Sequence, residues 1–276
     1  MKRFIPILLL IAVSACSTYE PAESERLVVD GWIDADGYPV VMVSSTLQVN
    51  TEEISKRDLN QHIKNWARVS INDGEKEEVL IGKRDDRYFP PFIYTTSRMR
   101  GEVGKRYTLN VYSDGESVTA QTSIPGTAGL ENIRAVKAKG ADTLYDIVAT
   151  LKGLPEDGTY YKVFVKVEGR DSIFMPSLFG NFDNSDINAE GTIKILPSTT
   201  QKWSNYDTFF HSGDKVRIKF CSMDGMSYRY WCDYEEILTL ARNPLFPVTR
   251  QICSNIDGGL GLWAGYGASF YTLTIP

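Results

Sequence analysis

Short segments in which apolar and polar residues alternate recur roughly every ten to fifteen residues, and this pattern restricts the fold more than any other feature. Between the segments stand Asp36-Gly37, Asn72-Asp73-Gly74 and Asp114-Gly115. Asn, Asp and Gly tolerate the positive φ that tight hairpins require. The pattern therefore predicts a mostly β protein built from antiparallel strands.

The first part of the chain predicts an immunoglobulin-like β-sandwich over residues 26–125, because six short strands fall within about 100 residues. The predicted strands are 27–33, 40–46, 67–71, 78–82, 107–112 and 118–124. The polar segment 51–65 predicts a loop or a short helix between strands. Ile124-Pro125-Gly126-Thr127 ends this unit, because proline followed by glycine neither continues a ladder nor starts a helix.

Residues 126–276 predict a second β-rich sandwich domain that carries one helix. The predicted strands are 133–138, 146–151, 160–167, 192–195, 216–221 and 269–275. In segment 160–167 alternate residues predict one dry face and one mostly wet face, the wet face carrying Lys162 and Phe164.

The helix is predicted at 227–242, where apolar residues recur at spacings of three and four, and this face is expected to pack on the second sheet. Asp224 or Ser227 is the predicted cap at its start, and Asn243-Pro244 ends it.

The N-terminus predicts an exported protein. Lys2 and Arg3 precede an apolar run at 4–13 that is far shorter than the roughly 20 residues of a membrane-spanning helix. Val13-Ser14-Ala15 then precedes Cys16, an order that resembles the lipobox of bacterial lipoproteins. We therefore expect residues 1–15 to be a signal peptide, Cys16 to be lipidated and residues 16–25 to form a tether. The alternative is an ordinary secretory signal cut near Ala15.

The charge balance argues against a nucleic-acid partner. Removal of residues 1–15 lowers the Lys and Arg total from 30 to 28 against 35 Asp and Glu, so the formal net charge becomes −7. A negative surface repels phosphate backbones.

Three cysteines remain in the mature chain, Cys221, Cys232 and Cys253, so at most one intramolecular disulfide can form among them. Buried free thiols are the alternative. A zinc site is not favoured, because there is no CxxC pair and His211 is the only nearby histidine.

No catalytic constellation emerges from the sequence. With His62 and His211 as the only histidines there is no HExxH motif, and GxSxG is absent. The adjacent Glu235 and Glu236 of the predicted helix point in different directions and make a poor glycosidase pair. The sequence predicts a protein that is not an enzyme and that needs no cofactor beyond the lipid on Cys16.

Two further segments favour structural explanations over ligand sites. The glycine-rich run 258–267 lacks the Lys-Ser/Thr pair of a phosphate loop and precedes a strand, so it predicts a close backbone approach or a bulge. The acidic segment 183–190 offers oxygen ligands that calcium uses, but it lacks the EF-hand glycine and terminal Glu and predicts an ordinary polar loop.

A cluster of aromatic residues in a loop-like stretch is the candidate interaction surface, for a protein or a glycan. Its members are Trp203, Tyr206, Phe209 and Phe210. The alternative is that these rings fold back onto the core.

Several motifs stand out along the chain: Leu27-Val28-Val29-Asp30-Gly31, the segments 66–74, 101–111 and 120–125, and above all Ser254-Asn255-Ile256-Asp257-Gly258-Gly259-Leu260-Gly261. Together they resemble a family of Bacteroidota outer-membrane lipoproteins defined by a domain of unknown function (DUF4249-like). Trp263 and Cys253 depart from the family pattern, which has Phe and Tyr there.

The resemblance implies an accessory or binding subunit of a TonB-dependent transporter, with an outer-membrane barrel as partner and the bilayer bound through the acylated N-terminus. An adhesive or structural surface lipoprotein is the alternative. Ser17 in place of Asp favours the outer membrane, and Glu20, Glu23 and Glu25 resemble a surface-export signal of Bacteroidota lipoproteins.

Overall fold

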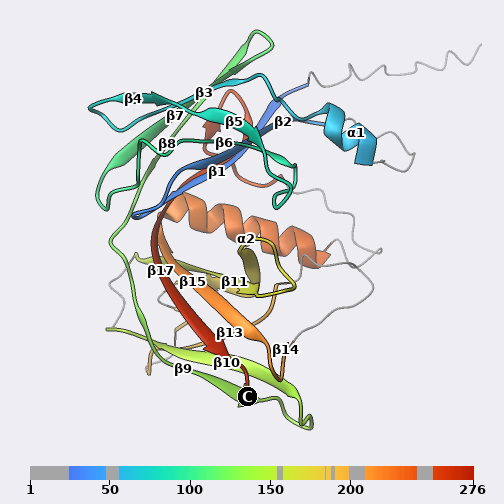
Figure 1. Cartoon of the computed structure of the whole chain (residues 1–276). Coiled ribbons are helices and arrows are strands. Elements are labelled where there is room, and N and C mark those ends of the chain that lie inside the picture. Colours follow the sequence, from blue (N-terminus) through green and yellow to red (C-terminus); the bar gives the residue numbers. More distant parts are fainter. Residues whose placement is uncertain are drawn as a thin grey trace, which may run out of the picture.

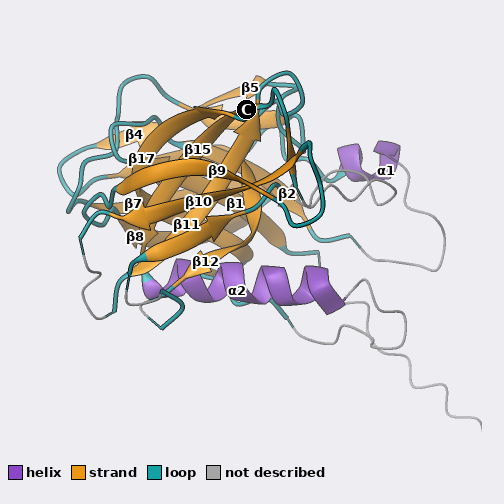
Figure 2. Cartoon of the chain, turned by 90° about the horizontal axis from the view of Figure 1, so that it is seen from below, coloured by secondary structure: helices purple, strands orange, loops and turns teal. Residues whose placement is uncertain are grey.

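The computed structural model is dominated by β-strands, which confirms the predicted fold class (Figures 1 and 2). It describes residues 25–47, 56–153, 158–183, 185–187, 190–198, 209–240 and 251–276. The strands are β1 (Leu27–Asp34), β2 (Val40–Ser45), β3 (Arg68–Asn72), β4 (Glu77–Val79), β5 (Ile81–Arg84), β6 (Phe92–Thr95), β7 (Arg106–Ser113), β8 (Glu116–Ser123), β9 (Leu130–Lys137), β10 (Leu144–Leu151), β11 (Tyr160–Val167), β12 (Met175–Phe182), β13 (Thr192–Ile195), β14 (Phe210–His211), β15 (Lys215–Met223), β16 (Ile256–Asp257) and β17 (Leu260–Thr274). The helices are α1 (Lys56–Gln61) and α2 (Gly225–Leu240).

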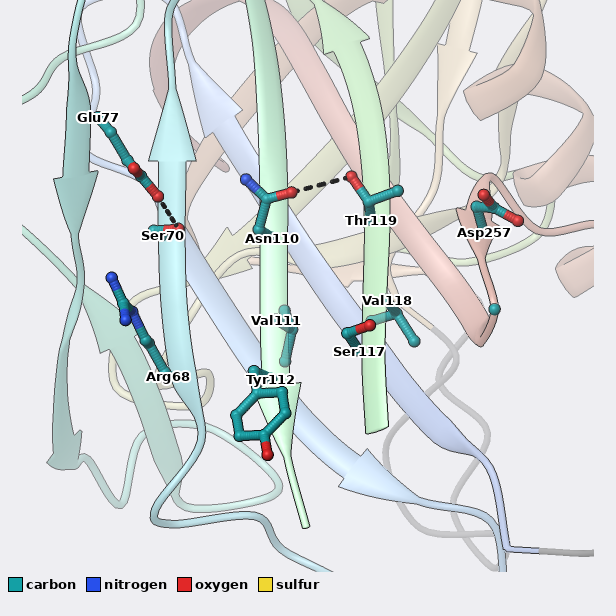
Figure 3. A pocket seen from close by; sticks show the side chains of 11 residues that line it. Arg68, Ser70, Glu77, Asn110, Val111, Tyr112, Ser117, Val118, Thr119 and Asp257 are labelled. Atoms are coloured by element: carbon teal, nitrogen blue, oxygen red, sulfur yellow. Dashed lines mark hydrogen bonds between the residues drawn. The ribbon is translucent and has the colours of Figure 1, made fainter. Parts of the chain in front are cut away.

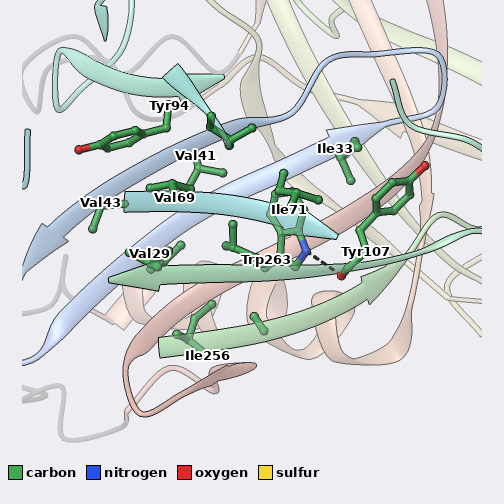
Figure 4. Packing of buried hydrophobic residues seen from close by; sticks show 14 of the residues in the cluster. Val29, Ile33, Val41, Val43, Val69, Ile71, Tyr94, Tyr107, Ile256 and Trp263 are labelled. Carbon is green, nitrogen blue, oxygen red and sulfur yellow. Dashed lines mark hydrogen bonds between the residues drawn. The ribbon is translucent and has the colours of Figure 1, made fainter. Parts of the chain in front are cut away.

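The first sandwich packs a five-stranded sheet, in the order β16-β8-β7-β3-β4, against strands β17, β1, β2, β6 and β5 of a larger sheet. Both sheets contribute apolar side chains to one core (Figure 4). Trp263 is fully buried in that core, and its indole Nε1–H donates to the backbone oxygen of Tyr107 at 3.1 Å. Truncating a buried side chain of this size costs about 3–5 kcal/mol, so Trp263 is a main source of stability in this sandwich.

The second sandwich packs β12, β11, β15 and the end of β17 against a smaller sheet made of β9, β10, β13 and β14. Tyr161, Val163, Val165 and Val167 of β11 all face its core, which confirms the predicted dry face. The predicted wet face is wrong, because Lys162 and Phe164 are buried beneath α2.

Strand β17 belongs to both sandwiches. Its residues Leu260 to Tyr266 pair with β1 in parallel, and Gly267 to Thr274 pair with β15 in the antiparallel sense. The result is a continuous eight-stranded sheet, β12-β11-β15-β17-β1-β2-β6-β5, that runs through the whole molecule. Up to β15, the predicted division at residue 125 separates the residues of the two cores: those before it belong to the first core and those after it to the second. However, Ile256 and Trp263, which the prediction placed in the second domain, are buried in the core of the first.

Two glycines of β17 explain how this strand fits. Gly261 has φ +109°, and a Cβ there would overlap the carbonyl oxygen of Val29 in β1. At Gly265 a Cβ would lie 2.5 Å from the carbonyl oxygen of Ser123 at the end of β8. The predicted close backbone approach is therefore confirmed, although the glycines lie within the strand rather than before it.

Helix α2 lies across the outer face of the large sheet (Figures 1 and 2). Asp224 caps the start of the helix, because its Oδ1 accepts a hydrogen bond from the Ser227 N–H at 2.7 Å. Of the two predicted caps, Asp224 is therefore the correct one. The predicted end at Asn243-Pro244 lies outside the described residues. Tyr228, Tyr230 and Trp231 of the helix pack against the sheet. Tyr230 belongs to the face predicted from the spacing of apolar residues, whereas Tyr228 and Trp231 do not.

One predicted strand, 78–82, is divided between the two sheets. Glu77–Val79 pairs with β3 in the five-stranded sheet, whereas Ile81–Arg84 pairs with β6 in the large sheet. Leu80 between them is buried and marks the corner. Sequence patterning did not find β6, β12, β14, β16 or the first half of β17.

Replacing Gly261 with alanine tests the role of the shared strand. The methyl group would overlap the Val29 carbonyl in a backbone conformation that L-residues avoid, so we expect the free energy of unfolding to fall by about 3–5 kcal/mol. Urea unfolding followed by tryptophan fluorescence measures this. Gly126→Ala, where a Cβ meets nothing within 4 Å, is the matched control and should change stability by less than about 0.5 kcal/mol. Equal stabilities of the two variants would contradict the close approach.

Candidate functional site

A solvent-filled hollow of about 530 Å³ lies on the outer face of the five-stranded sheet (Figure 3). Side chains from every strand of that sheet line it. They are Arg68, Ser70, Glu77, Asn110, Val111, Tyr112, Ser117, Val118, Thr119, Asp257 and Gly258. Most of these residues are polar, so the hollow is unlike the apolar clefts that hold most drug-like ligands.

The strand register explains why these residues meet. Ser70 pairs with Asn110, Asn110 with Thr119, and Thr119 with Asp257, so four polar residues form one row across the sheet. Arg68, Tyr112 and Ser117 form the next row. Successive residues of a strand point to opposite faces. The neighbours Val69, Val111 and Val118 therefore fill the core while these two rows face outward.

Hydrogen bonds between neighbouring strands hold several side chains of the hollow in place. Ser70 Oγ, although it faces outward, is almost fully buried and donates to Glu77 Oε1 at 2.6 Å. Thr119 Oγ1 donates to Asn110 Oδ1 at 3.1 Å, which leaves the amide NH₂ of Asn110 turned away from Thr119 (Figure 3). The ring of Tyr112 stays 53% exposed at one end. The hollow thus presents one open aromatic ring beside fixed donors and acceptors.

A second polar cluster lies on the outer face of the large sheet, partly beneath α2. Lys162 Nζ lies 3.1 Å from Glu235 Oε1, and Lys219 Nζ lies 2.6 Å from Asp34 Oδ1. Both ammonium groups also face aromatic rings: Lys162 lies 4.7 Å from the ring centre of Trp231, and Lys219 lies 5.0 Å from that of Tyr266. Both lysine side chains are buried, so a ligand in solvent does not reach them.

Burial and charge pairing act on these lysines in opposite directions. Burial lowers the pKa of Lys162 by more than Glu235 raises it. Burial also opposes the charge of Lys219, but Asp34 outweighs it and the pKa of Lys219 is raised. Nearby, burial raises the pKa of the Cys221 thiol to about 12, which leaves it protonated and unreactive. The cluster is therefore a structural layer and not a reactive site.

Asp30 lies on the same face of β1 as Asp34 and is more exposed than the paired carboxylates Asp34 and Glu235. Although its side chain is exposed, the surrounding protein desolvates it and raises its pKa from 3.8 to about 6. The folded state keeps this proton to higher pH than the unfolded chain does, so its contribution to stability falls as the pH rises from about 4 to about 6.

The structure places only some of the predicted site residues. Cys16, Trp203 and Tyr206 lie outside the described residues. Phe209 is half-buried, and Phe210 is fully buried in the second core as part of β14. Phe210 is therefore not part of an interaction surface, because its ring packs inward.

The three mature cysteines, Cys221, Cys232 and Cys253, are free thiols, which is the alternative to a disulfide that the sequence left open. Cys221 lies on β15 and Cys232 on α2, whereas the backbone N–H of Cys253 donates to Asp233 Oδ2 at 2.9 Å. Among the described residues no group of His, Cys, Asp and Glu is arranged to hold a metal ion.

The remaining candidates stay apart from one another. His62 contacts Ser45 Oγ at 3.0 Å beside the first sandwich, whereas His211 lies on β14 of the second. Glu235 faces Lys162 while Glu236 is exposed, which confirms that the two adjacent carboxylates point in different directions. In the part of the chain that the structure describes, no helix has the length and apolarity needed to cross a membrane.

Sequence reasoning missed the hollow. Its signal was present as alternating polar residues within predicted strands, such as 108, 110 and 112 or 117, 119 and 121. That pattern shows which residues of a strand face outward. It does not show which strands lie side by side, so it does not reveal which outward residues meet in the hollow. The partner strand β16 comes from a segment more than 130 residues further along the chain than β8.

The buried pair of Lys219 and Asp34 can be tested against an exposed pair. Asp34→Asn leaves a buried ammonium without its counter-charge, and we expect a loss of about 3–5 kcal/mol in the free energy of unfolding. Glu168→Gln, which breaks the exposed Lys215–Glu168 pair of 3.0 Å, is the control and should cost less than about 1 kcal/mol. Thermal and urea unfolding at pH 7 measure both variants. Similar losses of unfolding free energy would show that the buried pair stabilises the protein no more than the exposed pair does.

Comparisons with known proteins place the chain in a family. No curated protein matches it. Among solved structures, one described as "Marsupial T cell receptor" is similar, with 9% identity, a TM-score of 0.22 and coverage of 73% of this chain and 67% of that chain. The model of the family "Domain of unknown function (DUF4249)" matches residues 16–271. As its motifs indicated, this chain belongs to the DUF4249 family.

Proposed function

We propose that this protein is a non-catalytic lipoprotein of the outer membrane that serves as the binding or accessory subunit of a TonB-dependent transporter. The observation that carries the binding role is the polar hollow on the five-stranded sheet. The lipid anchor rests on Lys2, Arg3, the apolar run 4–13 and Cys16. The transporter partnership rests on the resemblance of the motifs to lipoproteins found beside such transporters.

The make-up of the hollow supports binding without catalysis. Its lining contains no His, Cys or Lys. Its two carboxylates, Glu77 and Asp257, stand on β4 and β16, the opposite edges of the sheet. Four strand spacings separate those edges by about 19 Å. A glycosidase pair needs its carboxyl groups about 5–10 Å apart, so Glu77 and Asp257 do not fit such a pair, which supports a binding role.

The fold also suits a subunit that holds a ligand in a fixed position. Strand β17 joins both sandwiches through continuous ladders, which favours a fixed arrangement of the two. Glu25, where the described chain begins, is nine residue steps from Cys16, and nine steps reach at most about 30 Å. A lipid on Cys16 would therefore keep the first sandwich, which carries the hollow, close to the membrane surface.

The alternative is an adhesive or structural surface lipoprotein. The same joined sandwiches favour it, because a rigid body is also what a spacer requires. The two functions differ in partner: the accessory subunit binds a barrel in its own membrane, whereas an adhesin binds a surface outside the cell.

Replacement of Cys16 tests the anchor. Without a sulfur to acylate, Cys16→Ser protein should leave the detergent phase of a Triton X-114 extract and appear in the aqueous phase. Cys253→Ser, which changes a free thiol far along the chain, is the matched control and should stay in the detergent phase. Retention of Cys16→Ser in the detergent phase would overturn the lipid anchor.

Purification from outer membranes tests the transporter partnership. An affinity tag after the exposed Pro276 allows capture in mild detergent, and mass spectrometry identifies the proteins that co-elute. We expect a TonB-dependent barrel in a stoichiometric amount, absent when an unrelated lipoprotein carries the tag. Recovery of the protein alone, from an extract in which another membrane complex stays intact, would contradict the accessory role and favour the adhesin.

A further inference from the structure

We propose that the hollow on the five-stranded sheet binds a neutral oligosaccharide. The inference rests on the proposed function as a binding subunit and names the chemistry of the ligand. It is argued from the residues that line the hollow and from their positions on the sheet (Figure 3).

The make-up of the lining argues against anionic and apolar ligands. One cation, Arg68, stands among two carboxylates, Glu77 and Asp257, so the hollow carries no positive excess that would attract a phosphate or a sulfate. Among its lining residues Tyr112 is the one that exposes a large apolar surface, because Val111 and Val118 are buried in the core, and one ring is too little to hold a lipid or another apolar ligand. A neutral ligand with many hydroxyl groups fits what remains.

The polar groups have the types and the spacing that a chain of hydroxyl groups needs. Asn110 offers amide donors, Asp257 offers acceptors, Ser117 offers a hydroxyl that does both, and Thr119, whose proton goes to Asn110, offers an acceptor oxygen. Because these residues stand on β7, β8 and β16, they recur at intervals of about 4.8 Å across the sheet. An oligosaccharide that lies across the strands would meet a new polar group at each strand.

Tyr112 supplies the apolar contact. Its ring is 53% exposed and is the aromatic ring in the lining of the hollow. Tyrosine gives a large and rigid contact area with a polar tip. The apolar face of a sugar ring that stacks on Tyr112 would place its hydroxyl edge toward Arg68 and Ser117, the neighbours of Tyr112 on the flanking strands.

The hollow is already ordered for binding. Ser70 orients Glu77, and Thr119 orients Asn110, through the hydrogen bonds described above. Asp257 precedes Gly258 at φ +79°, where a Cβ would lie 3.2 Å from the carbonyl oxygen of Ser117, so the tight turn after β16 sets the position of Asp257. A site that is ordered in advance loses less entropy when it binds.

Calorimetric titration of the purified full chain tests the proposal. The probes are maltohexaose, cellohexaose, mannohexaose and xylohexaose as neutral ligands, and hexagalacturonate as an anionic one. We expect at least one neutral probe to bind, and Tyr112→Ala and Asn110→Ala each to weaken that binding by about tenfold or more. Both side chains point to solvent, so circular dichroism and the melting temperature should show that the variants stay folded.

Phe270→Ala is the matched control, because Phe270 is an aromatic residue of similar exposure, 51%, on β17 in the second sandwich. Its binding should equal that of the wild type. Failure of every neutral probe to bind at 5 mM, preference for the anionic probe, or unchanged affinity in Tyr112→Ala would each overturn the proposal. The titration contains no barrel, so its failure is distinct from failure of the transporter partnership. The Tyr112→Ala protein should still co-purify with a barrel.

Discussion

The whole structure depends on the fit of strand β17 between two sandwiches. The inward positions of its first half are Gly261, Trp263 and Gly265, so one large side chain stands between two positions at which no side chain fits. The glycines let β1 and the end of β8 approach the strand, and Trp263 fills the space that this approach encloses (Figure 4). Because the same strand then continues beside β15, the packing of the first core also fixes the position of the second.

The layer beneath α2 adds a second constraint. The outer face of a sandwich sheet usually meets solvent, yet here it holds two buried lysines, Lys162 beneath α2 and Lys219 beside Asp34 of β1. Any sliding of α2 that separated Lys162 from Glu235 would leave a buried charge without its partner, which is strongly unfavourable. The aromatic rings of Phe164, Trp231 and Tyr266 around the two ammonium groups add cation–π attraction. The Lys162–Glu235 pair therefore restricts where the helix can lie.

The sequence predicted the features that short segments determine, and it missed the features that arise from contacts between distant segments. The boundaries of β11 and β13, the Asp224 cap and the glycine-dependent approach all follow from local patterns. Trp263 was assigned to the second domain, because local pattern does not reveal that residues 256–266 return to the first core. Lys162 was placed in solvent because the position of the helix that covers it is set by tertiary packing. The hollow was missed for the same reason, since its rows exist only once β16 lies beside β8.

These constraints together give the molecule two different outer faces. In the first sandwich the five-stranded sheet and the large sheet are separate layers, and α2 covers the large sheet on its far side (Figure 1). The hollow therefore opens on one side of the molecule and the helix stands on the other. Strand β17 links the two faces, because it places Trp263 in the core behind the hollow and Leu262, Ala264 and Tyr266 in the layer that α2 covers. The position of the helix relative to the hollow is therefore set by this one strand.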